Sequence, residues 1–290
     1  MPPFPPSPLV STAWLAGQLT RPDLVILDTS WYLPVTGRVA REEYRAGHIP
    51  GAVFFDLDQA SDPESSLPHM LPTETRFAAY TGGLGVGSGS EVVVYDGSGN
   101  NLSAARAWWM FRVFGHERVA LLDGGLGKWR AEGRPLEWGE TVRQPASFQV
   151  RLNRSAVRDR SEVHRALATG SAQLVDGRSA GRFAGTDPEP RPGLAAGHMP
   201  GALSLPYTGL VHPDGTALDL VELRRALAAA GVSLDRPVIA SCGSGVTACN
   251  LLLAFHRLGH ADSALYDGSW TEWASSGLPV AKGADPGRIQ

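Results

Sequence analysis

The chain carries the same set of short motifs twice, in the same order, and no other feature constrains its fold as strongly. The spacing between the copies is about half of the 290 residues. A repeat of this length indicates a duplicated domain, because solenoid repeats recur every ~20–50 residues. Four landmarks occur in both halves: an apolar run with an Asp (25–29 and 174–178), the motif A-G-H-x-P-G-A (46–52 and 196–202), a second apolar run (92–96 and 237–242), and L-x-D-G followed by a Trp (121–129 and 265–273).

The stretch between the two sets of landmarks predicts the domain boundary. Residues 138–149 are mostly polar and include Gly139 and Pro145, as is typical of a linker. We therefore expect a first domain over 1–140, a linker over 141–157 and a second domain over 158–290, which begins with a helix.

Each copy alternates short apolar runs with amphipathic stretches. The runs have four or five residues rich in Val and Leu, as in 92–96, which suits strands buried on both faces. Helical patterns such as 103–114 and 220–230 lie between them. The alternation predicts two α/β domains, each with a mostly parallel sheet flanked by helices. Ligands of such sheets bind beyond the carboxyl ends of the strands.

Composition excludes several kinds of partner and site. The chain has 26 Lys and Arg against 29 Asp and Glu, so we expect no nucleic-acid partner and no membrane-surface partner. No apolar run approaches the ~18 residues of a membrane helix, and the proline-rich start lacks a secretory pattern. The two cysteines form no metal-binding pattern, so we expect no metal and a reduced protein in the cytoplasm.

Cys242 has the strongest chemical setting in the chain. It follows the apolar run 237–241 and opens the glycine-rich stretch CGSGVT, after which a helical pattern begins. A loop of this kind can aim several backbone N–H groups at one point, and the helix N-terminus adds unpaired donors. Such an environment stabilises a thiolate, so we expect Cys242 to be a nucleophile rather than a small buried apolar residue. Cys249 falls inside the helical pattern, and we expect it to serve packing.

Two chemistries use a cysteine in this setting. A phosphatase of the C-x5-R type needs an Arg six residues after the cysteine, and this position holds Ala248. Sulfur transfer, in which the thiolate becomes a persulfide, needs only the N–H donors and remains open. In the first copy Asp96 occupies the aligned position, in a longer loop. Because a carboxylate cannot carry a persulfide, we expect the first domain to be non-catalytic and Asp96 to be a loop hydrogen-bonding residue.

The repeat, the two H-x-P-G-A segments and the loop CGSGVTA resemble the two-domain rhodanese-like family. The loop is most similar to the branch of this family that uses 3-mercaptopyruvate. Thiosulfate-using members typically carry C-R-K-G-V-T, whereas Gly243 and Ser244 stand here at the basic positions. Four longer strings are also similar to the mercaptopyruvate branch: 30–34, 108–116, 181–193 and 266–270.

The resemblance implies roles for individual residues. It implies that Cys242 carries sulfur within a ring of N–H donors, and that Arg182 and Arg191 bind the carboxylate and keto oxygen of the donor. It further implies that Asp58 and His69, from the patterns FFD-x-D and HMLP, join Ser244 in moving a proton. The remaining residues of the loop are expected to bind the substrate: Gly243, Gly245, Val246 and Thr247.

The expected function is sulfur transfer from 3-mercaptopyruvate, through a persulfide on Cys242, to a thiol, a thioredoxin-like protein or cyanide, with release of pyruvate. The resemblance implies no cofactor, and we expect a monomer. Two alternatives remain open. One is a thiosulfate sulfurtransferase, and the other is a non-catalytic sulfur carrier or interaction protein.

Overall fold

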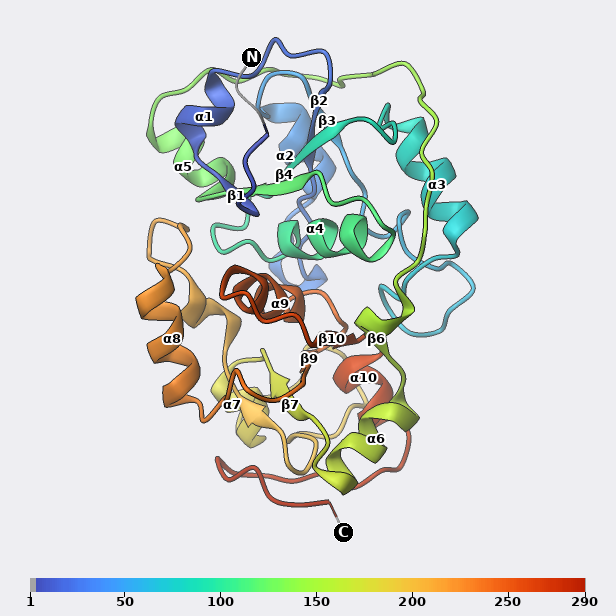
Figure 1. Ribbon diagram of the computed structural model, residues 1–290, viewed down its shortest axis with the longest axis vertical. Helices are drawn as coiled ribbons and strands as arrows, with labels where there is room; N and C mark the ends of the chain where they lie inside the picture. Colours follow the sequence, from blue (N-terminus) through green and yellow to red (C-terminus); the bar gives the residue numbers. More distant parts are fainter. Residues whose placement is uncertain (1–3, 290) are drawn as a thin grey trace. The chain divides into compact units, whose positions relative to one another are not determined.

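The computed structural model describes residues 4–289, which form two compact units. Unit 1 comprises residues 4–64, 71–153 and 212–217, and unit 2 comprises residues 65–70, 154–211 and 218–289. Each unit thus includes one short segment from the opposite half of the sequence. In both units, strands alternate with helices along the chain, as the sequence predicts (Figure 1).

Unit 1 contains a five-stranded, all-parallel sheet in the order β1-β5-β4-β2-β3. The central strands β2 and β4 are buried along their whole length, which explains the apolar runs 24–27 and 92–95 within them. The strands are β1 (Leu9–Val10), β2 (Leu24–Asp28), β3 (Ala52–Phe54), β4 (Glu91–Tyr95) and β5 (Val119–Leu122); the helices are α1 (Thr12–Ala16), η1 (Pro34–Thr36), α2 (Ala40–Ala46), α3 (Glu74–Gly83), α4 (Ala104–Val113) and α5 (Gly125–Ala131).

Unit 2 repeats the same topology, with the strand order β6-β10-β9-β7-β8 and parallel pairing throughout. The equal strand order confirms the predicted duplication and fold class. The strands are β6 (Val157–Arg158), β7 (Gln173–Asp176), β8 (Leu203–Ser204), β9 (Val238–Ser241) and β10 (Ser263–Tyr266); the helices are η2 (Arg154–Ala156), α6 (Arg160–Thr169), α7 (Ala180–Ala184), η3 (Tyr207–Leu210), α8 (Leu220–Ala229), α9 (Ala248–Arg257) and α10 (Ser269–Ala274).

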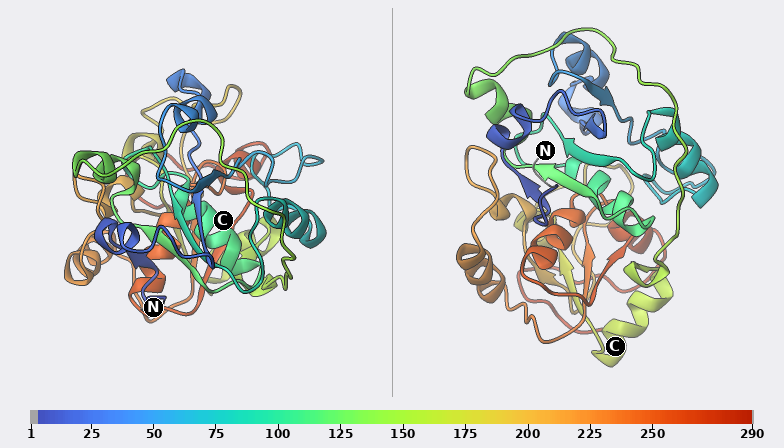
Figure 2. Two further views of the ribbon diagram at one scale, coloured as in Figure 1. Left: turned by 90° about the horizontal axis from the view of Figure 1, so that it is seen from above. Right: turned by 45° about the horizontal axis from the view of Figure 1, so that its top comes forward.

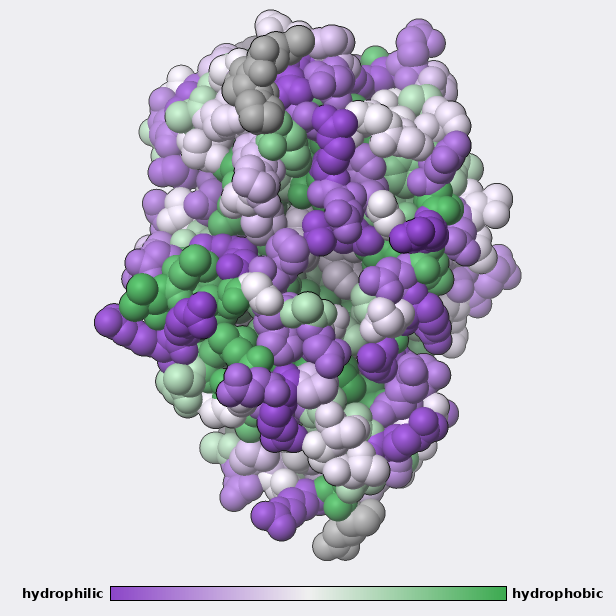
Figure 3. Space-filling view, viewed as in Figure 1, coloured by the Kyte–Doolittle hydropathy of each residue, from purple (hydrophilic) through white to green (hydrophobic). Residues whose placement is uncertain are grey.

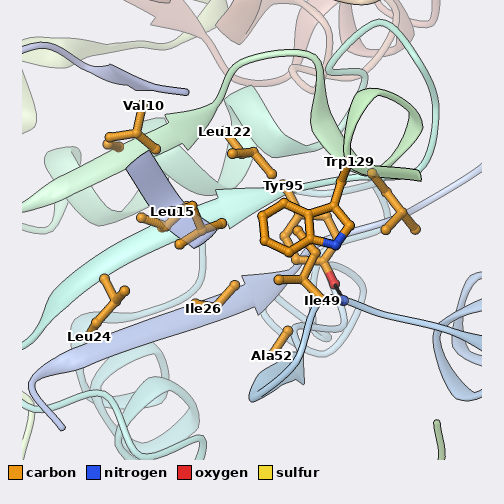
Figure 4. Close-up of a cluster of buried hydrophobic side chains, with 12 residues drawn as sticks. Val10, Leu15, Leu24, Ile26, Ile49, Ala52, Tyr95, Leu122 and Trp129 are labelled. Carbon is orange, nitrogen blue, oxygen red and sulfur yellow. Dashed lines mark hydrogen bonds between the residues drawn. The ribbon is translucent and has the colours of Figure 1, made fainter. Parts of the chain in front are cut away.

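The repeated tryptophans lie in equivalent hydrophobic cores. Trp129 is fully buried in a cluster of unit 1 that includes Leu15, Ile26 and Leu122 (Figure 4). Its counterpart Trp273 is fully buried in unit 2. Each indole N–H donates to a proline carbonyl six residues later, at 2.8 Å and 2.9 Å. The repeated tryptophans therefore serve packing.

The repeated histidines are also structural. His48 and His198 are both fully buried. Their Nδ1 atoms hydrogen bond to the carbonyls of Tyr44 at 2.9 Å and Phe183 at 2.8 Å, and each imidazole stacks on the ring of that same residue. Each histidine also bridges in antiparallel fashion to a later segment, His48 to Glu137 and His198 to Ala281, so both link a helix to the chain that follows the last helix of their unit.

The chain that follows α5 runs in extended form along the outside of unit 1, as Figures 1 and 2 show. Its backbone bonds to the unit: Ala146 N–H donates to the Gly82 carbonyl at 2.9 Å, and Gln149 N–H donates to the Ser88 hydroxyl at 2.8 Å. The first part of the expected linker 141–157 is thus fastened to unit 1.

The surface drawn in Figure 3 is mainly hydrophilic, with hydrophobic residues in small groups. No helix within residues 4–289 has the length and apolar character needed to cross a membrane. Large hydrophobic side chains that are exposed include Val35, Trp138, Val142 and Val221.

Two equivalent aspartates end the second strand of each sheet, and their surroundings differ. Asp176 in unit 2 pairs with the guanidinium of Arg178 at 2.6 Å. Asp28 in unit 1 instead accepts from the backbone N–H of Ser30 at 3.0 Å. Burial without a countercharge raises the pKa of Asp28 from 3.8 to about 6.

This raised pKa makes Asp28 a source of pH-dependent stability. The folded state holds the proton more tightly than the unfolded state, so stability is full below pH ~4 and falls as the pH rises through ~6. Asp28→Asn keeps an acceptor for Ser30 but does not ionise. As the pH rises from ~4 through ~6, we expect the free energy of unfolding of this variant to increase relative to the wild type by up to ~3 kcal/mol. Urea unfolding of both proteins at pH 4 to 8 measures the difference. A difference that stays constant with pH would contradict this account.

Candidate active site

Cys242 lies where strand β9 ends and the loop 242–247 leads into α9, as the sequence predicts. The residue is 1% exposed and its thiol is free. Gly245 has φ +73°, a left-handed conformation that only glycine adopts without steric cost. Cys249 is buried inside α9, and its thiol donates to the Gly245 carbonyl at 3.3 Å, which fits the expected packing role.

Several backbone N–H groups of this loop have no acceptor within residues 4–289. They belong to Gly243, Ser244, Val246 and Thr247. Buried N–H groups are costly when unpaired, and a turn that presents several of them in succession binds an anion. A thiolate or persulfide of Cys242 would be such an anion.

Helix α10 holds the other polar groups of the loop. The Trp270 N–H donates to the Cys242 carbonyl at 3.0 Å. The N–H and the hydroxyl of Thr271 both donate to the Gly243 carbonyl, at 3.0 Å and 2.7 Å. The hydroxyl oxygen of Ser269 accepts from the N–H groups of Cys242 and Gly245, at 3.2 Å and 3.0 Å.

Arg182 lies over the start of the loop. A Cβ atom at Gly243 would be 3.0 Å from Nη2 of Arg182, so the absence of a side chain at 243 leaves room for the guanidinium. Glu189, whose side chain is 3% exposed, fixes Arg182 by a bond of 2.6 Å from Nη2. Glu189 also accepts from Arg178 at 2.7 Å. Burial lowers the pKa of Arg178, but Asp176 and Glu189 outweigh this effect, so its pKa is raised.

Ser244 lies between two other predicted site residues. Its hydroxyl oxygen is 3.2 Å from Nδ1 of His69 and accepts from Nη2 of Arg191 at 3.3 Å. Ser244 and His69 are each 6% exposed. His69 has φ +60°, which is strained for a residue other than glycine. The hydroxyl can donate to a neutral His69 while it accepts from Arg191.

Asp58 belongs to unit 1, where its carboxylate accepts from the indole N–H of Trp31 at 3.3 Å. His69 belongs with unit 2. The structure therefore brings Cys242, Ser244 and His69 together in one unit with both arginines, and the participation of Asp58 stays a prediction.

Three polar residues of this site were missed by sequence reasoning. Glu189 stands between Arg182 and Arg191 in the string 181–193, which could have suggested an ion pair. Ser269 and Thr271 lie 27 and 29 positions beyond Cys242, and nothing in the local sequence indicates that they touch its loop.

The aligned loop of unit 1 already contains its own anion. The Asp96 carboxylate accepts from the backbone N–H groups of Ser98 at 2.8 Å, Ser103 at 2.9 Å and Ala104 at 2.9 Å. The predicted loop role of Asp96 is confirmed, and so is the greater length of this loop, which extends to the start of α4 at Ala104. The carboxylate fills the place that an anionic sulfur would need.

Comparison with known proteins agrees with this geometry. A model of the Rhodanese-like domain matches residues 11–132 and 159–276, so the chain belongs to the family of proteins with Rhodanese-like domains. Thiosulfate/3-mercaptopyruvate sulfurtransferase 1, mitochondrial, from Arabidopsis thaliana is 46% identical, over 94% of this chain and 78% of the relative. Human 3-mercaptopyruvate sulfurtransferase is 45% identical, over 93% of each chain.

A solved structure is similar over nearly the whole fold. The crystal structure of SseA from Escherichia coli, described as a 3-mercaptopyruvate sulfotransferase, has a TM-score of 0.84 and 42% identity. The match covers 91% of this chain and 99% of that chain. The predicted pair of rhodanese-like domains is confirmed by these similarities.

The buried position of Glu189 leads to a test of stability. Glu189→Gln would leave the buried guanidinium of Arg178 without half of its countercharge, so we expect the free energy of unfolding to fall by ~3 kcal/mol. Urea unfolding measures it. Glu140 provides a matched control, because it also contacts two arginines, Arg41 and Arg45, but at the surface. Glu140→Gln should cost less than ~1 kcal/mol, and equal losses would contradict the argument.

Proposed function

We propose that the protein is a 3-mercaptopyruvate sulfurtransferase in which Cys242 carries the transferred sulfur. One observation carries the proposal: a buried, free cysteine opens a loop with unpaired N–H groups, beneath a guanidinium that can hold an anionic donor. The names and the identity of the relatives support the same chemistry.

In the first half-reaction, the thiolate of Cys242 attacks the sulfur of 3-mercaptopyruvate and a sulfur–sulfur bond forms. The carbon–sulfur bond of the donor breaks, and its electron pair remains on the carbon as the enolate of pyruvate. The proton of the donor thiol moves to that carbon, so pyruvate leaves and an anionic persulfide stays on Cys242. The unpaired N–H groups of the loop can donate hydrogen bonds to this anion and so stabilise it.

In the second half-reaction, a thiol, a thioredoxin-like protein or cyanide takes the outer sulfur. The bond between the two sulfur atoms breaks, and its electron pair returns to Cys242 as a thiolate. The same loop N–H groups stabilise the product, because the anion regenerates in the same place.

We propose that Ser244 and His69 move the proton that reaches the enolate. The distance of 3.2 Å between them fits a hydrogen bond through which a proton passes. The family resemblance adds Asp58 to this set. Arg191 donates to Ser244, so the group proposed to bind the donor also touches the proposed proton path.

The site favours an α-keto acid as donor over thiosulfate. The side chains at Gly243 and Ser244 are uncharged, and Glu189 balances part of the charge of Arg182. A dianion such as thiosulfate would gain more from the extra cations that this loop lacks. Thiosulfate is the second candidate donor, because the name of the Arabidopsis relative includes both donors.

We further propose a monomer in the cytoplasm whose first domain is non-catalytic. The proposed sulfur and donor residues Cys242, Arg182 and Arg191 come from one unit of one chain, so they require no second copy. Neither cysteine is in a disulfide, which fits a reducing compartment. The Arabidopsis relative is named as mitochondrial, so cell fractionation is the deciding measurement of location. Sedimentation velocity decides the oligomeric state.

The central test compares the two donors under the same conditions. We expect kcat/KM for 3-mercaptopyruvate to exceed that for thiosulfate, and Cys242→Ser to abolish turnover with both because a hydroxyl cannot carry a persulfide. Cys249→Ser is the matched control and should keep most of the activity. Mass spectrometry should find the donor sulfur on Cys242. Sulfur on Cys249, or an equal rate with thiosulfate, would overturn the proposal.

The arginines should act on the donor half-reaction alone. A charged hydrogen bond contributes ~1.5–3 kcal/mol, so Arg182→Ala or Arg191→Ala should slow persulfide formation from 3-mercaptopyruvate by about 10- to 100-fold. Enzyme loaded with sulfur from polysulfide should still discharge to cyanide at nearly the normal rate. Rapid-mixing measurements of both half-reactions test this, with the exposed Arg224→Ala as control. Equal effects on formation and discharge would remove the arginines from donor binding.

A further inference from the structure

The first turn of α10 holds the loop of Cys242 in one orientation. Peptide groups are planar and trans, so the carbonyl of one residue and the N–H of the next point in opposite directions. The carbonyls of Cys242 and Gly243 are bonded to the turn by Trp270 and Thr271. The N–H groups of Gly243 and Ser244 must therefore point away from α10, where they remain unpaired.

Ser269 completes this arrangement through its hydroxyl. The hydroxyl donates to the Tyr266 carbonyl at 2.8 Å and accepts from the N–H groups of Cys242 and Gly245. Its one proton and both lone pairs are thus in use, at a residue that is fully buried. The N–H groups of Cys242 and Gly245 thus have an acceptor that carries no charge. The other N–H groups of the loop remain unpaired.

The backbone of Ser269 indicates that its side chain is needed. Ser269 has φ +50°, a left-handed conformation that favours glycine. The equivalent residue of unit 1, Gly125, has φ +53°. This position is therefore left-handed in both copies, although the glycine before it is left-handed at Gly124 (φ +84°) and right-handed at Gly268 (φ −66°). Only the copy with the cysteine places here a residue that costs backbone strain.

Both copies share a backbone hydrogen bond from this turn to the loop, but only unit 2 adds a hydroxyl. In unit 1 the Leu126 N–H donates to the Asp96 carbonyl at 3.1 Å, which is the counterpart of the bond from Trp270 to Cys242. Gly125 provides no hydroxyl, and the N–H groups of that loop bond to the Asp96 carboxylate instead. A loop that holds its own anion needs no hydroxyl from the turn, whereas a loop that must receive an anion does.

We propose that Ser269, assisted by the hydroxyl of Thr271, is a positioning residue that keeps the N–H groups of the Cys242 loop available for anionic sulfur. This inference rests on the proposed function, in which Cys242 alternates between a thiolate and a persulfide. Ser269 acts through the loop backbone and takes no part in bond formation.

Ser269→Gly provides the sharpest test, because glycine removes the hydroxyl and also relieves the strain. We expect folding stability near that of the wild type, whereas persulfide formation from 3-mercaptopyruvate should slow by about 10- to 100-fold. Alkylation of Cys242 by iodoacetamide should shift to higher pH, since the thiolate is less stabilised. A purely structural turn predicts the opposite result, with Ser269→Gly as active as the wild type and an unchanged alkylation profile.

Thr271 gives a second, independent variant. Thr271→Val keeps the shape of the side chain but removes the hydroxyl, so we expect a smaller loss of roughly 3- to 10-fold. Thr271→Ser should restore the rate and the alkylation profile, because it returns the hydroxyl. Ser276→Ala is the matched control: this hydroxyl follows the same helix and bonds to the Trp273 carbonyl, away from the loop.

Alkylation requires no donor, so the two proposals fail separately. If the wild type forms no persulfide from 3-mercaptopyruvate but the alkylation profile still shifts in Ser269→Gly, the proposed function is wrong and the positioning role stands. If the wild type turns over the donor, and neither Ser269→Gly nor Thr271→Val changes the rate or the profile, the positioning role is overturned.

Discussion

The site depends on backbone N–H groups that the fold leaves unpaired where a parallel strand ends and a helix begins. In helices and strands, backbone N–H groups donate to carbonyls of the same helix or of a neighbouring strand. In the loop between β9 and α9, most N–H groups make no such bond. In unit 1 the equivalent loop closes on the Asp96 carboxylate. In unit 2 the first loop residue is Cys242 instead, and within residues 4–289 the N–H groups of Gly243, Ser244, Val246 and Thr247 have no acceptor.

Guanidinium groups near this loop are paired with buried carboxylates. Arg178, Arg182 and Arg191 bring positive charge to the site, and Asp176 and Glu189 offset two of these charges. A buried guanidinium is tolerated when carboxylates bond to it, and the pairs also restrict how Arg182 can turn. Gly243 completes the arrangement because it leaves space for the Arg182 guanidinium.

Duplication allowed the two copies to diverge at a few positions while the frame was retained. The strand order, the buried histidines and the buried tryptophans are equivalent in both units. The differences lie at the ends of strands: Asp28 lacks the arginine that accompanies Asp176, Asp96 replaces the cysteine, and Gly125 replaces Ser269. Each difference removes from the first copy a feature of the candidate site in unit 2, and none disturbs the core.

The sequence by itself determined the duplication, the parallel α/β fold and the cysteine at a strand end, because repeats, apolar runs and glycines are local signals. It also indicated Arg182, Arg191, Ser244 and His69, but only through resemblance to a family. Tertiary structure alone decided that His69 reaches Ser244 across 175 positions, that Glu189 fixes Arg182, and that Ser269 holds the loop. These contacts join segments that are distant along the chain, or depend on side-chain direction within a loop, and neither property leaves a periodic pattern in the sequence.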